Sequence, residues 1–146
     1  MIEEKKGLKK QHKFYEEDGD QCWCIFDIDE YWNQNKKVFV KAVTLAKQNN
    51  ISLAWSNECF ELWYLLHFQT LQTAISRKDY DTRLKKHFQK LDGKSYSKNN
   101  KVFMRLVQKQ SEAVKNAKRI IDQYKVEKNP STAVFLLVEE LNGLEK

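Results

Sequence analysis

The stretch CWCIFDIDE at residues 22–30 decides the fold class of this chain. Apolar and aromatic residues that favour a buried strand lead directly into Asp27 and Asp29, two carboxylates that stand two positions apart. In a strand such residues point to the same side, so a strand end aims both carboxylates at one place. Two carboxylates suit Mg²⁺ or Mn²⁺, which prefer oxygen ligands. The structural alternative is that Asp27 ends the strand and Asp29 caps the next helix.

The segments on either side of this stretch predict a strand–helix–strand unit. Residues 21–27 read as a strand that is apolar on both faces, which is typical of a central strand covered by helices on each side. Residues 35–49 form an amphipathic helix, with Val38 and Leu45 among its buried positions. Residues 51–55 read as a second short strand, and a helix between two strands predicts that the strands pair in parallel.

Residues 58–68 predict a helix inside the domain, because they are apolar almost all round. Asn57 is a suitable N-cap for this helix. Glu61 is unusual there, since a buried carboxylate costs free energy unless it is paired, hydrogen-bonded or bound to a metal. Structural pairing and a role in an active site both remain open for Glu61. His67 ends the helix, either as a partner of the helix dipole or as a ligand.

The remainder of the chain predicts helices only. One-sided apolar stripes, which include Leu91 and Leu141, mark helices at residues 79–91, at residues 100–125 and from Asn129-Pro130 onward. The stripe of residues 100–125 indicates ordinary packing, with a coiled-coil homodimer as the alternative. Residues 3–17 read as a further, polar helix.

These segments predict an α/β fold in one domain. A small parallel sheet flanked by helices occupies residues 1–68, and a helix-rich C-terminal half occupies residues 69–146. A chain of 146 residues with 41% hydrophobic residues buries a core without disulfides.

The cysteines and the hydropathy favour a cytoplasmic protein. Cys22, Cys24 and Cys59 are odd in number and lie in apolar segments, which predicts free thiols in a reducing compartment. No run of 18 apolar residues is present, so a membrane-spanning helix is not expected.

The positive charge gathers in the second half of the chain. Residues 77–128 hold 16 Lys and Arg against 6 Asp and Glu, a local net charge of +10, while the remainder carries −4 of the total of +6. A basic region of this kind attracts a polyanion such as DNA or RNA. The alternative is a solvated lysine-rich surface without a nucleic-acid role.

The carboxylates are the remaining candidates for chemistry. The sequence contains no glycine-rich phosphate loop, no His-Glu-x-x-His helix and no Gly-x-Ser-x-Gly motif. Sites in open α/β sheets form outside the carboxyl ends of the strands. Asp27 and the turn at residues 56–58 are both expected at that edge, and Glu30 and Glu61 complete the acidic cluster.

Several stretches resemble the RloB family. They are FDIDE at residues 26–30, AWSNECFELWYLLHF at residues 54–68, and NPST at residues 129–132 followed by LLVEEL at residues 136–141. Their order and spacing fit the family, and together they cover most of the chain from about residue 21. The block at residues 56–63 is long enough to be specific.

The resemblance implies a function. Such proteins are bacterial and archaeal, are typically encoded beside an AAA-type ATPase near restriction or phage-defence genes, and are similar to Toprim-like nucleases that bind magnesium. By this likeness Asp27 and Asp29 are the metal-binding and catalytic pair.

The resemblance also names residues around that pair. Glu61 is a catalytic candidate, and Asn57 and His67 match the family's second block and border the site. Lys98, in the polar loop of residues 93–99, and Thr132, near the start of the last helix, are expected to contact substrate phosphates.

One departure from the family supports a second hypothesis. Family members usually open with a strand followed by a Glu-Gly-x-x-Thr-Glu motif, whereas residues 1–20 read as a polar helix. The first hypothesis is a magnesium-dependent nuclease that works with the ATPase. The second is a non-catalytic subunit, truncated or degenerate, that binds nucleic acid or the ATPase.

Overall fold

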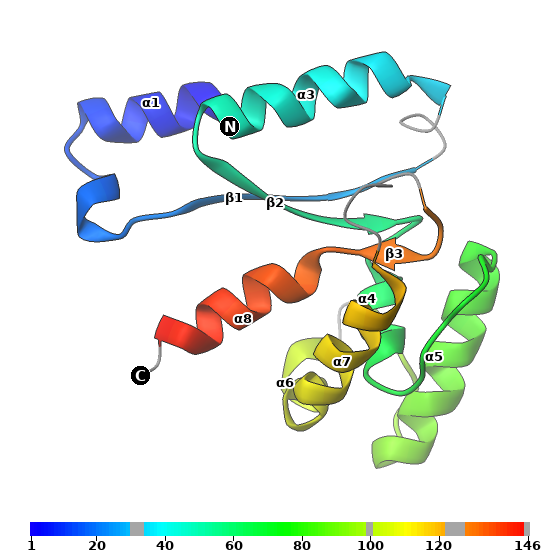
Figure 1. The fold of residues 1–146 in the computed structure, drawn as a ribbon. Helices are drawn as coiled ribbons and strands as arrows, with labels where there is room; N and C mark the ends of the chain where they lie inside the picture. The colour runs from blue at the N-terminus through cyan, green and yellow to red at the C-terminus, as the bar shows by residue number, and fades with distance from the viewer. Residues whose placement is uncertain (30–33, 99–100, 122–127, 145–146) are drawn as a thin grey trace.

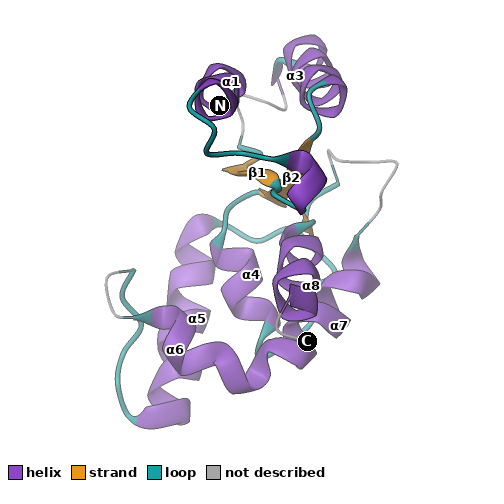
Figure 2. Cartoon of the chain, turned by 90° about the vertical axis from the view of Figure 1, so that its left-hand side faces the viewer, coloured by secondary structure: helices purple, strands orange, loops and turns teal. Residues whose placement is uncertain are grey.

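The chain folds as a small sheet between two helical layers. The computed structural model describes residues 1–29, 34–98, 101–121 and 128–144. Helices α1 and α3 cover one face of the sheet, and α4 to α8 gather on the other, as Figures 1 and 2 show from two directions. The α/β class and the helix-rich second half are confirmed.

The sheet has the strand order β1–β2–β3. β1 (Cys22–Asp27) and β2 (Ile51–Asn57) pair in parallel, as the sequence predicted, and their register places Cys22 opposite Ile51 and Asp27 opposite Ser56. β3 (Ser131–Thr132) pairs antiparallel to β2, so the sheet is mixed, and the expectation of helices only after residue 68 was wrong. Two residues are too short for a strand pattern to show in the sequence.

The prediction that β1 is the central strand was also wrong. β1 lies at the outer position of the described sheet, and Ile25 on it is more than half exposed. The central strand is β2, in which Ala54 and Ser56 are completely buried. Apolar residues on both faces of a strand indicate that other elements pack on each face. They do not show whether the strand lies at the centre or at the edge of the sheet, and at the edge the packing is incomplete.

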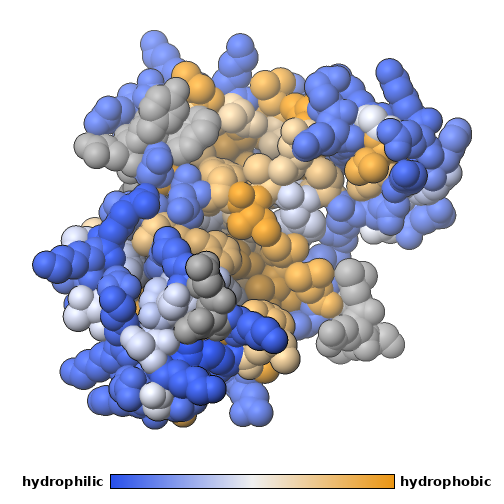
Figure 3. All heavy atoms as spheres, turned by 180° about the vertical axis from the view of Figure 1, so that it is seen from behind, coloured by the Kyte–Doolittle hydropathy of each residue, from blue (hydrophilic) through white to orange (hydrophobic). Residues whose placement is uncertain are grey.

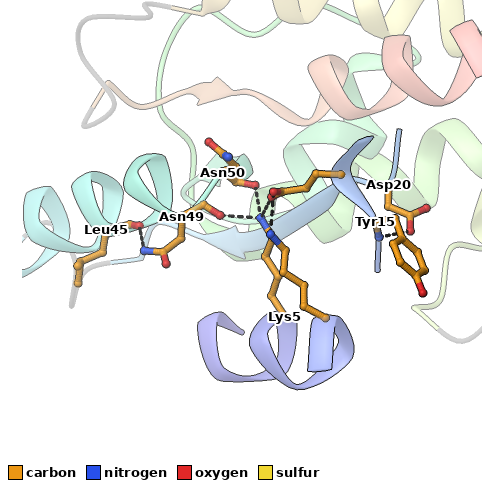
Figure 4. A network of polar contacts seen from close by, with 8 residues as sticks. Lys5, Tyr15, Asp20, Leu45, Asn49 and Asn50 are labelled. Carbon is orange, nitrogen blue, oxygen red and sulfur yellow. Dashed lines mark hydrogen bonds and ion pairs between the residues drawn. The ribbon is translucent and has the colours of Figure 1, made fainter. Parts of the chain in front are cut away.

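Lys5 fastens helix α1 (Ile2–Lys10) to the C-terminal end of α3. Its Nζ donates to the carbonyls of Asn49 at 2.6 Å and Asn50 at 3.0 Å, and to Oε1 of Glu16 at 2.6 Å (Figure 4). A buried ammonium group at a helix C-terminus satisfies carbonyls that have no intrahelical partner. The expected helix over residues 3–17 ends early, at Lys10, and a 3₁₀ turn at Glu16–Asp18 follows it.

Helix α3 (Lys36–Gln48) packs on the sheet through a narrow stripe. Phe39 and Val43 are half-buried and Ala46 is buried, whereas Val38 and Leu45, which the sequence placed on the buried side, are exposed. Its contacts are made mainly with β2, so only the positions at the centre of its apolar face find a partner.

The main core surrounds α4 (Glu61–Leu66) and lies on the face of the sheet opposite α1 and α3. This helix is shorter than the predicted range of residues 58–68. Helix α5 (Arg77–Asp92) packs against it and starts at a capping box, in which the Ser76 side chain accepts from the Asp79 amide. Buried side chains from several elements complete this core: Leu62, Leu65, Leu66, Tyr80, Leu84, Phe88, Tyr96, Leu106, Ala113, Ala117 and Phe135.

The helix predicted over residues 100–125 is divided. α6 (Val102–Leu106) is followed by a 3₁₀ segment at Val107–Lys109 and by α7 (Gln110–Ile120), and residues 100 and 122–125 of the prediction lie outside the described residues. The buried positions keep a helical spacing across the division, so the apolar pattern of the sequence does not reveal it.

The last helix also differs from its prediction. α8 (Val134–Leu144) begins after β3 and not at Pro130. Val134 and Val138 are buried in the core, but Leu141 is more than half exposed although the sequence placed it there.

The surface carries apolar side chains between two hydrophilic regions, as Figure 3 shows. Ile25 on β1, Phe103 on α6 and Leu141 on α8 are each more than half exposed, and they line one groove. None of the helices in the described ranges is long and apolar enough to cross a membrane.

Candidate active site

Asp27 ends β1 at the carboxyl edge of the sheet. The pairing continues one residue further, because the Ile28 amide donates to the Ser56 carbonyl at 2.8 Å, and this fixes the strand end. The Phe60 amide donates to the Asp27 carboxylate. Burial raises the pKa of Asp27 and the charge of Glu61 raises it further, so these two carboxylates lie within electrostatic range of each other.

Glu61 stands in the first turn of α4, where the helix dipole favours a negative charge. Its carboxylate forms an ion pair with Nζ of Lys98 and accepts from the Cys59 thiol. Burial acts to raise the pKa of Glu61, but these hydrogen bonds and that of its own amide outweigh burial and lower it. The structure thus answers how the buried carboxylate is satisfied: its partner is a lysine from a distant loop.

Arg105 holds the loop that carries Lys98. α5 ends at Gly93, whose φ of +75° is accessible to glycine at little cost. The Arg105 guanidinium then donates from Nε and Nη2 to the two carboxylate oxygens of Asp92, at 2.7 Å each, and from Nη2 to the Lys94 carbonyl at 2.7 Å. A bidentate pair of this kind fixes geometry as well as charge.

A polar cleft of about 680 Å³ opens beside these groups. Its lining includes the cations Arg77, Lys78, Lys85 and Lys98 and the carboxylates Glu61 and Asp81, so four positive charges stand against two negative ones. Nε of Arg77 donates to Glu58 at 3.2 Å, and the charge of Arg77 also acts on Asp27. The cleft is therefore a net-positive hollow in which the Glu61 side chain is mostly buried and the Asp81 side chain is about half exposed, and its net charge suits an anionic ligand.

The other predicted acidic residues are placed less centrally. Asp29 is half-buried and follows Ile28, which is almost completely buried. Glu61, Arg77 and Lys98 are the charged groups with the largest effects on the pKa of Asp27. Glu30 lies outside the described residues. Within the described ranges, no group of three or more His, Cys, Asp or Glu side chains is arranged to hold a metal ion.

Asn57 and Thr132 lie in the sheet and do not line the cleft. Asn57 is completely buried at the end of β2, and α4 begins after Phe60 without a side-chain cap, so the prediction of Asn57 as its N-cap was wrong. The Thr132 hydroxyl donates to the Trp55 carbonyl at 2.9 Å and accepts from Ser56 Oγ at 2.8 Å and the Val134 amide at 3.3 Å. These contacts use the one hydrogen and both lone pairs of the Thr132 hydroxyl, so it has no donor or acceptor left for a phosphate.

His67 also lies away from the cleft. It lines the apolar groove together with Trp63 and Gln110, and its Nδ1 donates to the Trp63 carbonyl at 2.9 Å. Burial lowers the pKa of His67 from 6.5 to about 4, so the imidazole is neutral at pH 7.

This low pKa predicts a loss of stability in acid. The unfolded chain binds a proton on His67 below pH 6.5 and the folded chain only below about pH 4, so the free energy of unfolding falls as the pH drops through that window. The contribution of His67 reaches about 3 kcal/mol, since one pKa unit corresponds to about 1.4 kcal/mol. Urea unfolding at pH 7 and pH 4.5 measures it. His67→Asn, which keeps a donor to Trp63 but does not titrate, is expected to show the weaker pH dependence, and equal dependence in both proteins contradicts the assignment.

Sequence reasoning missed Arg77 and Tyr96. Arg77 and Lys78 stand in the first turn of α5, where the helix dipole disfavours cations, and such a broken local rule is a signal of a binding site. Tyr96 lines the cleft and is buried, and its hydroxyl has no hydrogen-bond partner in the described part of the chain. No sequence signal separates Tyr96 from an ordinary core aromatic residue.

The comparison with protein families agrees with the resemblance noted in the sequence. No curated protein and no solved structure matches the chain. The family described as RloB-like protein matches residues 1–141, which is nearly the whole chain. The chain therefore belongs to the RloB-like protein family.

Proposed function

We propose that this protein is a metal-dependent phosphodiesterase that cleaves DNA or RNA. The observation that carries the proposal is the net-positive cleft whose lining includes Glu61, from the start of α4, with Asp27, from the end of β1, within electrostatic range of that carboxylate. Acidic groups beside a cationic hollow are what phosphodiester cleavage requires, because a metal ion and the phosphates must be held side by side.

The donor set fits Mg²⁺ or Mn²⁺. Magnesium is usually held by one or two carboxylates, with water and substrate phosphate as the remaining ligands, and seldom by an all-protein cage. Asp27 and Glu61 would supply these carboxylates, and Asp29 remains a predicted further ligand. The rise that Glu61 causes in the pKa of Asp27 marks a place where added positive charge is stabilising. When bound, such an ion neutralises phosphate charge and lowers the pKa of a bound water.

The side chains of the cleft would bind and orient the substrate. Lys78 and Lys85 attract the polyanion to the opening, and Arg77 and Lys98 contact phosphates close to the carboxylates. Membership of the RloB-like family extends the proposal to a phage-defence or restriction-linked system with an AAA-type ATPase as partner.

A second candidate function is a non-catalytic subunit that binds nucleic acid or the ATPase. The observation that favours it is the ion pair of Glu61 with Lys98, because a carboxylate that already has a counter-ion does not need a metal. The basic cleft would then serve binding alone.

One assay separates the two functions. Purified protein is incubated with end-labelled single- and double-stranded DNA and RNA in Mg²⁺, in Mn²⁺ and in EDTA. Cleavage that needs the metal and stops in EDTA supports the phosphodiesterase. Salt-sensitive binding without cleavage under every metal condition overturns it in favour of the second candidate.

A further inference from the structure

The ion pair between Glu61 and Lys98 joins two very different side chains. The Glu61 side chain is 13% exposed on the first turn of α4, whereas the Lys98 side chain is 73% exposed on the loop after α5. The Lys98 ammonium regains water as soon as it leaves, so its own departure costs little, and the free-energy cost of breaking the pair falls on Glu61. Glu61 cannot follow, because α4 lies in the centre of the core.

The departure of Lys98 leaves Glu61 in need of another cation. Two partly buried carboxylates, Asp27 and Glu61, then lie within electrostatic range of each other, and an uncompensated charge in such a place is costly. A divalent ion held by oxygen ligands removes this cost. Lys98 and the metal ion are thus alternative counter-ions for the same carboxylate.

The cleft offers Lys98 a new partner if an anion enters. Arg77 and Lys78 line the same cleft, so a phosphate group is attracted to it. Tyr96 supplies a second, independent indication of a ligand, because it lines the cleft and its buried hydroxyl has no hydrogen-bond partner within the described ranges. A buried hydroxyl without a hydrogen-bond partner is rare, and a polar atom of an entering ligand would satisfy it.

We propose that the cleft is a phosphate subsite of the substrate and that Lys98 exchanges Glu61 for this phosphate, which frees Glu61 for the metal ion. The inference rests on the proposed function and adds a coupling to it. Because linkage is reciprocal, phosphate raises the affinity for the metal by the factor by which the metal raises the affinity for phosphate. The protein therefore takes up its metal together with its substrate.

The test measures Mn²⁺ binding by calorimetry, with and without thymidine 5′-monophosphate, and corrects for the complex of the metal with the nucleotide alone. For the parent protein, the nucleotide is expected to tighten Mn²⁺ binding by at least about 5-fold, the lower end of typical couplings. Lys98→Met is expected to bind Mn²⁺ about 10-fold more tightly without nucleotide and to gain nothing further when the nucleotide is added.

Two matched variants complete the experiment. Lys118→Met removes a lysine outside the cleft, one that pairs with Glu139 at 2.6 Å, and is expected to keep the coupling of the parent. Tyr96→Phe is expected to weaken nucleotide binding without changing Mn²⁺ affinity in its absence. The exchange is overturned if Lys98→Met binds Mn²⁺ no more tightly than the parent, or if the nucleotide still tightens Mn²⁺ binding in that variant.

Asp27→Asn distinguishes this failure from that of the proposed function. If the parent binds Mn²⁺ and Asp27→Asn does not, the metal site stands, and an unchanged Lys98→Met overturns the exchange alone. If the parent and Asp27→Asn bind Mn²⁺ equally, or neither binds it, both the metal site and the exchange are wrong.

Discussion

Asp27→Asn is expected to lower metal-dependent cleavage by at least about 100-fold. Asparagine keeps the size of the side chain and an oxygen that accepts from the Phe60 amide, so the fold at the end of β1 is retained. It removes the charge with which Asp27 would hold the metal ion. A bound metal contributes several kcal/mol of charge stabilisation in the transition state, and each 1.4 kcal/mol corresponds to a factor of ten in rate. Single-turnover cleavage of the substrate identified by the metal assay measures the loss.

Two further variants show whether the loss of cleavage is specific to Asp27. Asp29→Asn is expected to lose activity to a similar extent if Asp29 is also a ligand, so the comparison tests the pairing that the sequence suggested. Asp81→Asn removes an acidic residue from the rim of the same cleft and is expected to cleave nearly as fast as the parent. Cleavage by Asp27→Asn at the rate of the parent removes the phosphodiesterase proposal.

Phe88→Ala is expected to lower the free energy of unfolding by about 3–5 kcal/mol, as is typical of a large aromatic side chain removed from a core. The ring of Phe88 is completely buried on α5 and lies 5.4 Å from that of Phe68 and 5.6 Å from that of Tyr96, between ring centroids. The Arg105 guanidinium covers it at 4.2 Å from the centroid. In a chain of this length the midpoint of thermal unfolding falls by about 10–20 °C.

Leu91→Ala is the control for Phe88→Ala. Both residues belong to the apolar stripe that the sequence assigned to this helix, but Leu91 is 36% exposed. Its truncation is expected to cost less than about 1 kcal/mol, because a partly exposed side chain loses little burial. Circular dichroism during heating measures both variants. Equal shifts would contradict the packing described for α5.

The local patterns of the sequence were sufficient for the class of the fold and for the strand that carries Asp27. Apolar runs of strand length and helical length alternate around residues 22–57, and this alternation alone predicts the parallel pairing of β1 with β2. The apolar stripe of α5 likewise predicted its buried face. Boundaries were less accurate, because α4 and α8 begin where tertiary contacts of the sheet end and not where the apolar pattern begins.

The apolar periodicity of the helices did not predict which side chains are exposed. Val38 on α3 and Leu141 on α8 are apolar at helical spacing, yet both are more than half exposed. A periodic pattern states which side of a helix is apolar, but how wide a stripe is covered depends on the neighbours of that helix. β1 shows the same limit, since its outer position in the sheet is not visible in its residues.

The sequence by itself determined the family, the α/β class and the place of Asp27 at a strand end, because these depend on residues close together in the chain. Only the tertiary structure decided that Glu61 meets Lys98, 37 positions later in the chain, that the Thr132 hydroxyl is fully used within the sheet, and that His67 lines a different hollow. Local spacing fixes the direction of a side chain on its own element. The partner that it reaches depends on how distant elements pack, and no short-range pattern records that packing.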